Sequence, residues 1–220
     1  MKYKQNDIEK VVEAFMLTSK PNDRSASFDY CYNYFRTSTS KDLLINMEKS
    51  CLAIGFYLAS WGMLRGSSFL LGKSAKYYEP LIIYIANQDK TLWEIDVQDY
   101  SDENIEKLIT IYKDIKNILI KGNNAHLTLV TKVMLGVFGF VPAYDRFFKN
   151  TFGEVFKNRC AFTSFNKNSL LCLRDFYGSN QEILKKLSSE NSTINFITGE
   201  KNILNYPRIK IIDMYGVAKG

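Results

Sequence analysis

The sequence is poor in the residues that build metal centres. Its 220 residues include one histidine, His126, and four cysteines, none of which forms a Cys-x-x-Cys pair. Because zinc and iron–sulfur sites need clustered ligands, we expect no metal, and nothing else in the sequence indicates a cofactor. The cysteines lie among apolar neighbours and are expected to be free, buried thiols in a reducing cytoplasm.

Features of exported and membrane-spanning proteins are also lacking. The first residues, MKYKQNDIEK, contain no apolar signal core. Two stretches, Leu52–Gly72 and Leu127–Ala143, are apolar, but Arg65 interrupts the first and Lys132 the second, and both contain glycine. A charge near the middle of a bilayer is costly, so we expect buried helices of a soluble protein and no contact with a membrane.

Neither disorder nor a repeat architecture is indicated. Hydrophobic residues are 46% of the chain and charged residues 24%, which is typical of a globular protein with a sizeable core. No internal repeat or low-complexity linker is visible, so we expect a single domain over residues 1–220. The net charge of +6 fits either a polyanionic partner or a merely basic surface, and it leaves both interpretations open.

Apolar residues at helical spacing are the main structural signal. The signal is clearest behind Ser101, an expected N-cap that Asp102 and Glu103 follow. The apolar stripe of this helix consists of Ile105, Leu108, Ile109, Tyr112, Ile115 and Leu119. Further helices are expected at Asp7–Leu17, Leu43–Ser60 and Tyr78–Ala86, behind Asp145 through Phe148 and Val155, and within Leu170–Ser188. The isoleucines that follow Tyr78 also permit a strand there.

A short turn and a second helix follow. The turn Lys121-Gly122-Asn123-Asn124 ends the first helix, because Gly122 suits a left-handed cap and asparagine suits a tight turn. The next helix, from about Ala125 to Phe138, is apolar on nearly all sides and is expected to be central. Gly139 and Pro142 end it.

The C-terminal region differs from the helical body, about residues 1–190. Thr193–Thr198 and Arg208–Met214 are rich in β-branched residues, with the turn formers Gly199 and Pro207 between them. We therefore expect residues 191–220 to form a small hairpin or an extended arm on the helical body. The expected fold class is mainly α, a helical bundle with a small β-rich C-terminal segment.

The two helices joined by the Lys121–Asn124 turn are followed by Val141-Pro142-Ala143-Tyr144-Asp145. This arrangement resembles the helix-hairpin-helix DNA glycosylase superfamily, in which an aspartate follows a Val-Pro step behind the hairpin. Thr131-Lys132-Val133 is similar to the Thr-Lys-Val of lysine-bearing members. The resemblance spans Asp102–Phe148, and it departs from the family in the sequence of the turn and in Tyr144, which stands before the acid.

The resemblance implies an enzyme that acts on DNA. A helix-hairpin-helix core would bind a phosphate through backbone N–H groups of Lys121, Gly122, Asn123 and Asn124. A damaged or modified base would be flipped out of the duplex, and Asp145 would stabilise the positive charge that develops while its N-glycosidic bond is hydrolysed. The superfamily serves in DNA repair, and some bacterial members resemble antiviral factors that excise modified bases of phage DNA.

Lys132 and Asp145 each have a structural interpretation beside the catalytic one. In lysine-type members the nucleophile lies close behind the hairpin glycine, whereas Lys132 follows Gly122 by ten residues. The spacing therefore favours Asp145 as the catalytic residue. Lys132 is more readily explained as a lysine that extends along an apolar helix and keeps its ammonium in water. Asp145, in turn, could cap the helix that follows it.

A second group of candidate binding residues lies in the turn behind Leu43–Ser60. Trp61, Arg65, Ser67 and Ser68 are expected near the pocket, because guanidinium and hydroxyl groups bind phosphates and the glycines between them allow close approach. An ordinary turn with Trp61 buried is equally consistent with the sequence.

Asn33, Arg36 and Tyr144 complete the candidate site. Asn33 and Arg36 could join the pocket, since an asparagine can read the edge of a flipped base, and Tyr144 is a candidate DNA contact beside the acid. The aromatic residues within Phe28–Phe35 form either part of the core or a base-stacking platform, and core is the favoured interpretation.

The alternative to an enzyme is a non-catalytic nucleic-acid-binding or protein-interaction module on the same helices. The geometry at Asp145 distinguishes the two. A glycosylase needs this carboxylate at the mouth of a base-sized cleft that Arg65 or Asn33 shares. A carboxylate in bulk solvent without a cleft favours the binding module.

Overall fold

Eleven α-helices, four short 3₁₀-helices and one two-stranded hairpin make up the regular structure of residues 5–122 and 124–220, which the computed structural model describes. The first helices are α1 (Gln5–Leu17), α2 (Ala26–Thr37), α3 (Ser40–Ile45), α4 (Met47–Ser60), α5 (Glu79–Ala86) and α6 (Asp102–Leu119). They are followed by α7 (Leu127–Phe138), α8 (Arg146–Val155), α9 (Lys167–Ser179), α10 (Gln181–Glu190), β1 (Ser192–Ile194), β2 (Lys201–Asn205) and α11 (Arg208–Lys219). The expected mainly helical class is confirmed.

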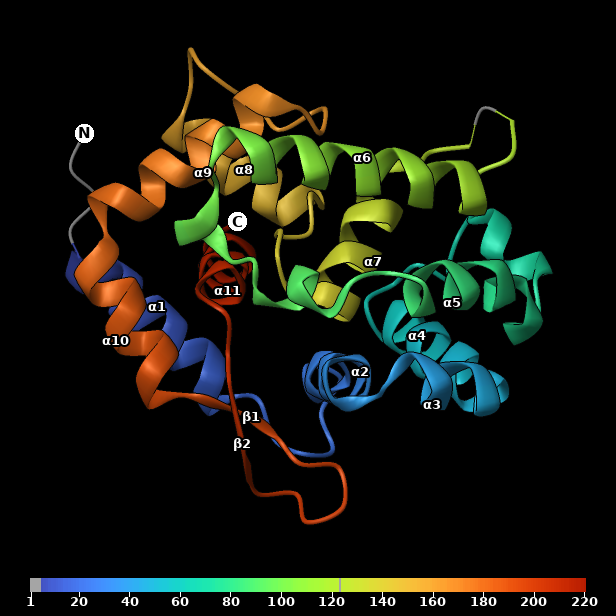
Figure 1. Cartoon of the computed structure of the whole chain (residues 1–220). Helices are drawn as coiled ribbons and strands as arrows, with labels where there is room; N and C mark the ends of the chain where they lie inside the picture. The colour runs from blue at the N-terminus through green and yellow to red at the C-terminus, as the bar shows by residue number, and fades with distance from the viewer. Residues whose placement is uncertain (1–4, 123) are drawn as a thin grey trace.

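Helix α11 is central to the molecule. Figure 1 shows it end-on in the middle, and it packs against α8, α1 and α10. A second group of helices is built on α2, which packs against α7 and α4, while α6 packs against α7 and α9. The buried apolar side chains of α1 through α11 form one cluster. The assignment of residues 1–220 to a single domain stays a prediction.

Helices α6 and α7 form for the reasons that the sequence suggests. The hydroxyl of Ser101 accepts a hydrogen bond from the N–H of Asn104 and so caps α6. The stripe that begins at Ile105 is buried, with Ile109 partly so. Every residue of α7 from Leu129 to Phe138 is buried, and Gly139 ends the helix in the left-handed conformation, with φ 73°. The expectation of a central α7 is therefore confirmed.

The prediction of a β-rich tail is right for its first half and wrong for its second. Residues of β1 and β2 form an antiparallel hairpin, but Arg208–Met214 belongs to α11. The carboxylate of Asp96, far away in the sequence, accepts hydrogen bonds from the N–H groups of Arg208 (2.7 Å) and Ile209 (2.9 Å). A helix capped by a distant residue and surrounded by core tolerates β-branched residues, because packing outweighs their weak helix propensity.

The structure corrects one expected helix and settles whether another segment is a helix or a strand. The single helix expected over Leu43–Ser60 is divided at Asn46, whose N–H and side-chain amide both donate to the carbonyl of Asp42. The Tyr78–Ala86 segment is the helix α5, with Pro80 in its first turn, and not a strand.

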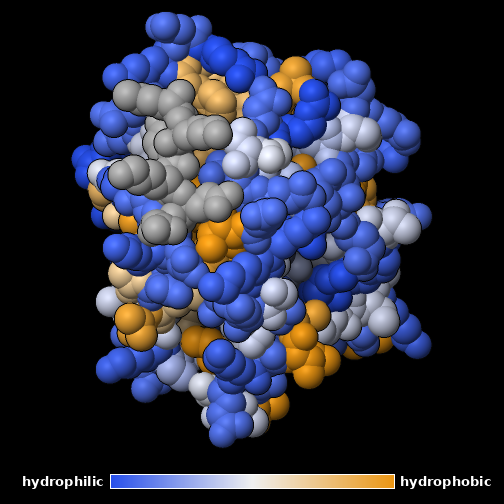
Figure 2. Space-filling model, turned by 90° about the vertical axis from the view of Figure 1, so that its left-hand side faces the viewer, coloured by the Kyte–Doolittle hydropathy of each residue, from blue (hydrophilic) through white to orange (hydrophobic). Residues whose placement is uncertain are grey.

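The surface and the two apolar stretches give no sign of a bilayer-spanning element in the described residues. None of the described helices is both long and apolar enough to cross a membrane. Figure 2 shows the face over α1 and α10, where hydrophilic residues predominate and apolar residues are interspersed. Leu52–Gly72 contains most of α4, an exposed turn around Arg65 and a short 3₁₀-helix, whereas Leu127–Ala143 is α7 with its following loop.

Candidate functional site

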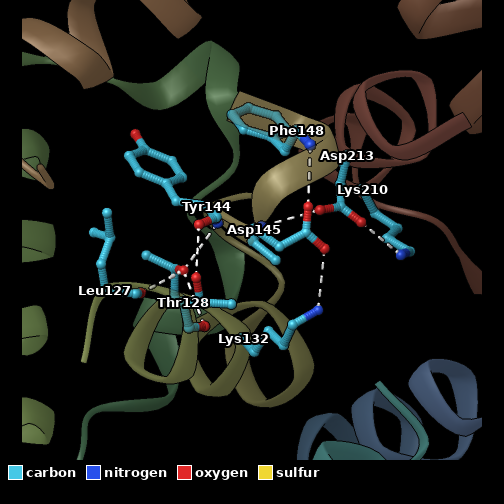
Figure 3. A network of polar contacts seen from close by, with 10 residues as sticks. Leu127, Thr128, Lys132, Tyr144, Asp145, Phe148, Lys210 and Asp213 are labelled. Carbon is cyan, nitrogen blue, oxygen red and sulfur yellow. Dashed lines mark hydrogen bonds and ion pairs between the residues drawn. The ribbon is translucent and has the colours of Figure 1, made fainter. Parts of the chain in front are cut away.

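The junction between α7 and α8 brings Lys132 and Asp145 together. The Nζ atom of Lys132 lies 3.3 Å from Oδ2 of Asp145, as Figure 3 shows. The two side chains are 4% and 15% exposed. The other carboxylate oxygen of Asp145, Oδ1, accepts the N–H of Phe148 at 3.0 Å and caps α8. Capping and ion pairing therefore coexist in one carboxylate.

Threonines of α7 hold the segment that carries Asp145 against the helix. The hydroxyl of Thr131 accepts the N–H of Tyr144, and the hydroxyl of Thr128 donates to the carbonyl of Tyr144, both at 2.9 Å. After Gly139 reverses the chain, these two bonds fix the backbone just before Asp145 (Figure 3). The position of the carboxylate is thus set by backbone as well as by its ion pair.

A second buried pair lies beside the first. Lys210 and Asp213, one turn apart on α11, have an Nζ–Oδ2 distance of 2.8 Å, and each side chain is 4% exposed. The Oδ1 atom of Asp213 accepts the N–H of Ala143 at 2.9 Å. Because Ala143 precedes Asp145 by two residues, this bond ties α11 to the same loop (Figure 3).

Trp61 is surrounded by positive charge. The Nζ atoms of Lys132 and Lys210 lie 5.3 and 5.4 Å from its ring centroid, and the guanidinium carbon of Arg24 lies 5.5 Å away. Such distances permit cation–π attraction. The indole Nε1 is buried and has no hydrogen-bond partner among the described residues. The ring is therefore held by packing and by cations, without a directional bond from its only donor.

Burial shifts the pKa of two groups near this site. Loss of solvent lowers the pKa of Lys132, an effect that Asp145 and Asp213 oppose. Burial also raises the pKa of Asp29 to about 7, although its hydrogen bonds from Tyr206 and Ile194 and the charge of Lys210 act in the other direction. An amine whose pKa is lowered has a larger neutral fraction, which is the form that acts as nucleophile or base.

The space at the Lys132–Asp145 pair is too small for a nucleobase. A cavity of about 10 Å³, lined by Tyr57, Trp61, Lys132, Asp145 and Asp213 among others, lies there. This volume accommodates at most about one water molecule. The pair is therefore almost closed off, and any larger reactant requires side chains to move.

A much larger open groove reaches α4 at Ser60, the residue before Trp61. It encloses about 1230 Å³ between α2, α4 and the turn of the β1–β2 hairpin. Its lining includes Arg24, Tyr30, Tyr34, Phe56, Ser60 and Phe196. Phe28, Tyr32 and Phe35 of α2 are core residues, as favoured, whereas Tyr30 and Tyr34 face the groove.

Three predicted site residues meet, namely Trp61, Lys132 and Asp145. The expectation that Lys132 reaches solvent is wrong, because α2, α4 and α6 pack against α7, the lysine side chain is buried, and its charge is paired internally instead. The spacing that favoured Asp145 over Lys132 does not separate them in space, since the loop behind α7 folds back along the helix. Trp61 is only partly buried.

The other residues of the predicted pocket lie elsewhere. Asn33 lines the groove, but its amide donates to the carbonyl of Ile194 and accepts the hydroxyl of Thr193, so it supports the hairpin. Arg36 pairs with Glu94 at 2.6 Å. The hydroxyl of Ser68 is used within its own turn, on Met63 and Leu70.

Of the other candidates, Arg65 and Ser67 lie on the surface and Tyr144 lies in the core. Arg65 and Ser67 are exposed and take no part in lining either space. Tyr144 is fully buried, with its hydroxyl on Ser169, so a direct contact of its side chain with DNA is ruled out in this conformation.

The turn between α6 and α7 is exposed at Lys121 and Gly122. Gly122 has φ 72°, as its predicted capping role requires, and the amide of Asn124 donates to the carbonyl of Lys121. Asn123 lies outside the described residues. The expected cleft at Asp145 that Arg65 or Asn33 would share is not formed by the described residues, since Asn33 lines the separate groove.

Sequence reasoning missed Arg24, Asp29, Lys210 and Asp213. The signal for the last two was present, since charged residues three apart interrupt the apolar run of α11, a spacing that pairs them only on a helix. Because Arg208–Met214 was expected to be a strand, Lys210 and Asp213 were not expected to pair. Asp29 and Arg24 carry no comparable local signal.

No group of three or more histidine, cysteine or acidic side chains suited to a metal occurs in the part of the chain that the structure describes. The four cysteines are free, and all but Cys160 are buried. Compared with known proteins, the chain matches no protein-family model, no curated protein and no solved structure.

Proposed function

We propose that the chain is a DNA N-glycosylase-like enzyme in which Lys132 and Asp145 form the reacting pair. The observation that carries the proposal is the 3.3 Å contact between the Lys132 amine and the Asp145 carboxylate, at the start of the helix that follows the α6–turn–α7 pair. The basic chain charge of +6 suits a polyanion such as DNA. The α6–α7 turn would take the place of the family's phosphate-binding hairpin.

The pair offers two elements of the required chemistry. Asp145, fixed as the N-cap of α8, can stabilise positive charge that develops on the sugar while the glycosidic bond breaks. Lys132, whose pKa burial lowers, can form a bond from its neutral amine to C1′ while the base leaves with the bonding electrons. Asp145 is placed to take the amine proton. Cleavage of the C1′–O4′ bond, with a proton passed to O4′, then gives an imine between Lys132 and C1′, which borohydride reduces and which water hydrolyses to release the sugar from the lysine.

A base-release assay tests this proposal. Purified protein is incubated with duplex and single-stranded DNA carrying uracil, oxidised, alkylated or hypermodified bases, and free base and abasic sites are measured. Asp145→Asn keeps a capping side chain but removes the charge, and it is expected to lower base release at least a hundredfold. Borohydride is expected to trap a covalent DNA adduct of the wild type that Lys132→Met does not form.

Two matched variants control for general damage. Lys157→Met and Asp175→Asn make the same changes at exposed positions and should leave base release within twofold of wild type. Base release by Asp145→Asn at the wild-type rate would sink the proposal. Trapping that persists in Lys132→Met would remove the lysine from the reaction and leave Asp145 in a hydrolytic mechanism.

The closed cavity favours the alternative of a binding module without catalysis. In that case Lys132 and Asp145 are only structural, and DNA binding should weaken with salt while no base is released from any substrate. Absence of both binding and release would leave a protein-interaction function.

A further inference from the structure

We infer that the groove between α2, α4 and the hairpin turn is the entrance to the Lys132–Asp145 pair, and that Trp61 is the displaceable wall between them. The occupant of the opened space, an extrahelical nucleotide, rests on the proposed function, whereas the route rests on geometry alone. The inference starts from the last turn of α4, which touches both spaces. Phe56 and Ser60 line the groove, while Tyr57 and Trp61 line the small cavity at the pair.

Contacts of Trp61 connect the two sides. Arg24 lines the groove and its guanidinium lies 5.5 Å from the indole centroid. Lys132, from the reacting pair, lies 5.3 Å from the same centroid. One aromatic ring thus lies next to both a groove residue and the buried amine, and we expect its displacement to join a space of about 1230 Å³ to one of about 10 Å³.

The indole can leave its place without breaking a hydrogen bond. Its buried Nε1 has no partner among the described residues, and a ring in motion toward water gains one. Gly62 and Gly66 follow it with φ 76° and 59°, conformations that glycine adopts without strain. Arg65, Gly66 and Ser67 at the end of this turn are exposed, so the turn has solvent into which it can move.

The space vacated by Trp61 suits a flat group with negative charge nearby. It is flanked by Arg24, Lys132 and Lys210, whose cations now face the π-electrons of the indole. A nucleobase can replace the ring in stacking against these cations, and its phosphate would meet the charge of Arg24 at the groove. Tyr30 and Phe56 along the groove offer further surfaces for stacking.

Chemical labelling of Lys132 tests the route without any DNA. Reductive methylation with formaldehyde and a borane, read residue by residue by mass spectrometry, reports access to the amine. Trp61→Ala is expected to raise the rate at Lys132 at least tenfold, and Trp61→Phe, which keeps a ring, to raise it less. Lys157, which is exposed, is the control lysine, and its labelling rate should be the same in all variants. Phe69→Ala removes another partly buried aromatic ring and should leave the labelling rate of Lys132 unchanged.

A plug distinguishes the groove from other routes. Ser60→Cys in the Trp61→Ala background is modified with a bulky maleimide, which is expected to return Lys132 labelling to near the wild-type rate. The same reagent on Ser189→Cys, on the distant and exposed face of α10, should have no effect. Unchanged labelling in both Trp61 variants, or labelling that the plug at residue 60 does not lower, overturns the inference.

Protection by a nucleic acid tests the occupant. A short single-stranded oligonucleotide is expected to slow maleimide modification of Ser60→Cys at least threefold and to leave Ser189→Cys unchanged. Equal rates with and without the oligonucleotide overturn the nucleotide as occupant. The labelling experiments need no catalysis, so they can support the route through the groove even if no base is released. Conversely, base release can be observed even if the labelling results contradict this route.

Discussion

The two buried lysine–aspartate pairs at the centre of the molecule differ in how they are held. Lys210 and Asp213 belong to one helix, lie 2.8 Å apart and are equally buried, and Asp213 is also bound by the N–H of Ala143. Lys132 and Asp145 come from α7 and from the cap of α8, lie 3.3 Å apart, and only the aspartate retains some exposure. One pair is fixed by a single helix, the other by a junction.

The two pairs therefore differ in what their geometry depends on. The geometry of Lys210 and Asp213 follows from one turn of α11 and does not change unless the helix unfolds. The distance between Lys132 and Asp145 depends on the loop behind Gly139, which bonds from Thr128, Thr131 and Asp213 hold in place. The second pair therefore depends on tertiary contacts, and it is the pair to which the proposed function assigns the chemistry.

Lys210→Met is the change expected to have the largest effect on stability. It leaves the carboxylate of Asp213 buried without its cation, and such a loss costs about 3–5 kcal/mol of unfolding free energy. Urea unfolding followed by circular dichroism at pH 7 measures it. The matched variant is Lys132→Met, whose partner Asp145 keeps some solvent and the N–H of Phe148, so its cost is expected to be about 2 kcal/mol.

Lys210→Met is thus expected to lose more unfolding free energy than Lys132→Met. If Lys132→Met destabilises the protein as much as Lys210→Met, both pairs are structural in the same sense. The distinction drawn from their geometry would then be wrong.

Asp29, beside Lys210, is expected to make stability depend on pH. Its folded pKa of about 7 lies above the ordinary 3.8, so between about pH 4 and pH 7 the folded carboxyl holds a proton that the unfolded chain has lost. The unfolding free energy should therefore fall as pH rises through this window, with a contribution approaching about 1.4 kcal/mol per pH unit.

Asp29→Asn isolates this contribution. The amide oxygen can still accept from Tyr206 and Ile194, but it does not titrate, so the variant should gain stability relative to wild type from pH 5 to pH 8. Urea unfolding at several pH values measures the difference. Parallel pH curves for variant and wild type would contradict the raised pKa, and Asp175→Asn, which is exposed, should run parallel.

The cap that Asp145 gives to α8 is expected to make the smallest contribution of the three to stability. Asp145→Ala and Asp145→Asn both leave the buried Lys132 without its anion, but the asparagine keeps a capping oxygen, so the alanine variant is expected to be about 1 kcal/mol less stable than the asparagine variant. Thermal or urea unfolding of the two variants measures the cap, and base release measures the charge. An alanine variant as stable as the asparagine variant would show that the cap contributes nothing beyond the ion pair.

The fold could be predicted wherever a local pattern decides the structure. The apolar stripe and Ser101 cap of α6, the wholly apolar α7, and Gly139 as its end all follow from residues within a few positions of one another. The prediction failed for α11, because its cap is Asp96 and its β-branched residues are stabilised by helices on every side.

The candidate site could be predicted only as a set of residue types. Asp145, Lys132 and Trp61 are named by motif and by chemistry, but the sequence spacing placed the lysine away from the acid. The bonds of Thr128 and Thr131 to Tyr144, which bring them together, are tertiary contacts between a helix and a loop. Arg65 and Asn33 illustrate the converse, since suitable chemistry in the sequence lies apart from the pair in space.

The sequence by itself determined that this protein is mainly helical, that α6 and α7 are joined by a glycine turn, and that an acid caps the helix behind them. Helical period and capping act within one or two turns, so the order of residues suffices. Only the tertiary structure decided which charges are paired and buried, that α11 is a helix, and that Trp61 lies against the cations of Arg24, Lys132 and Lys210. These depend on burial, which no segment produces without the others.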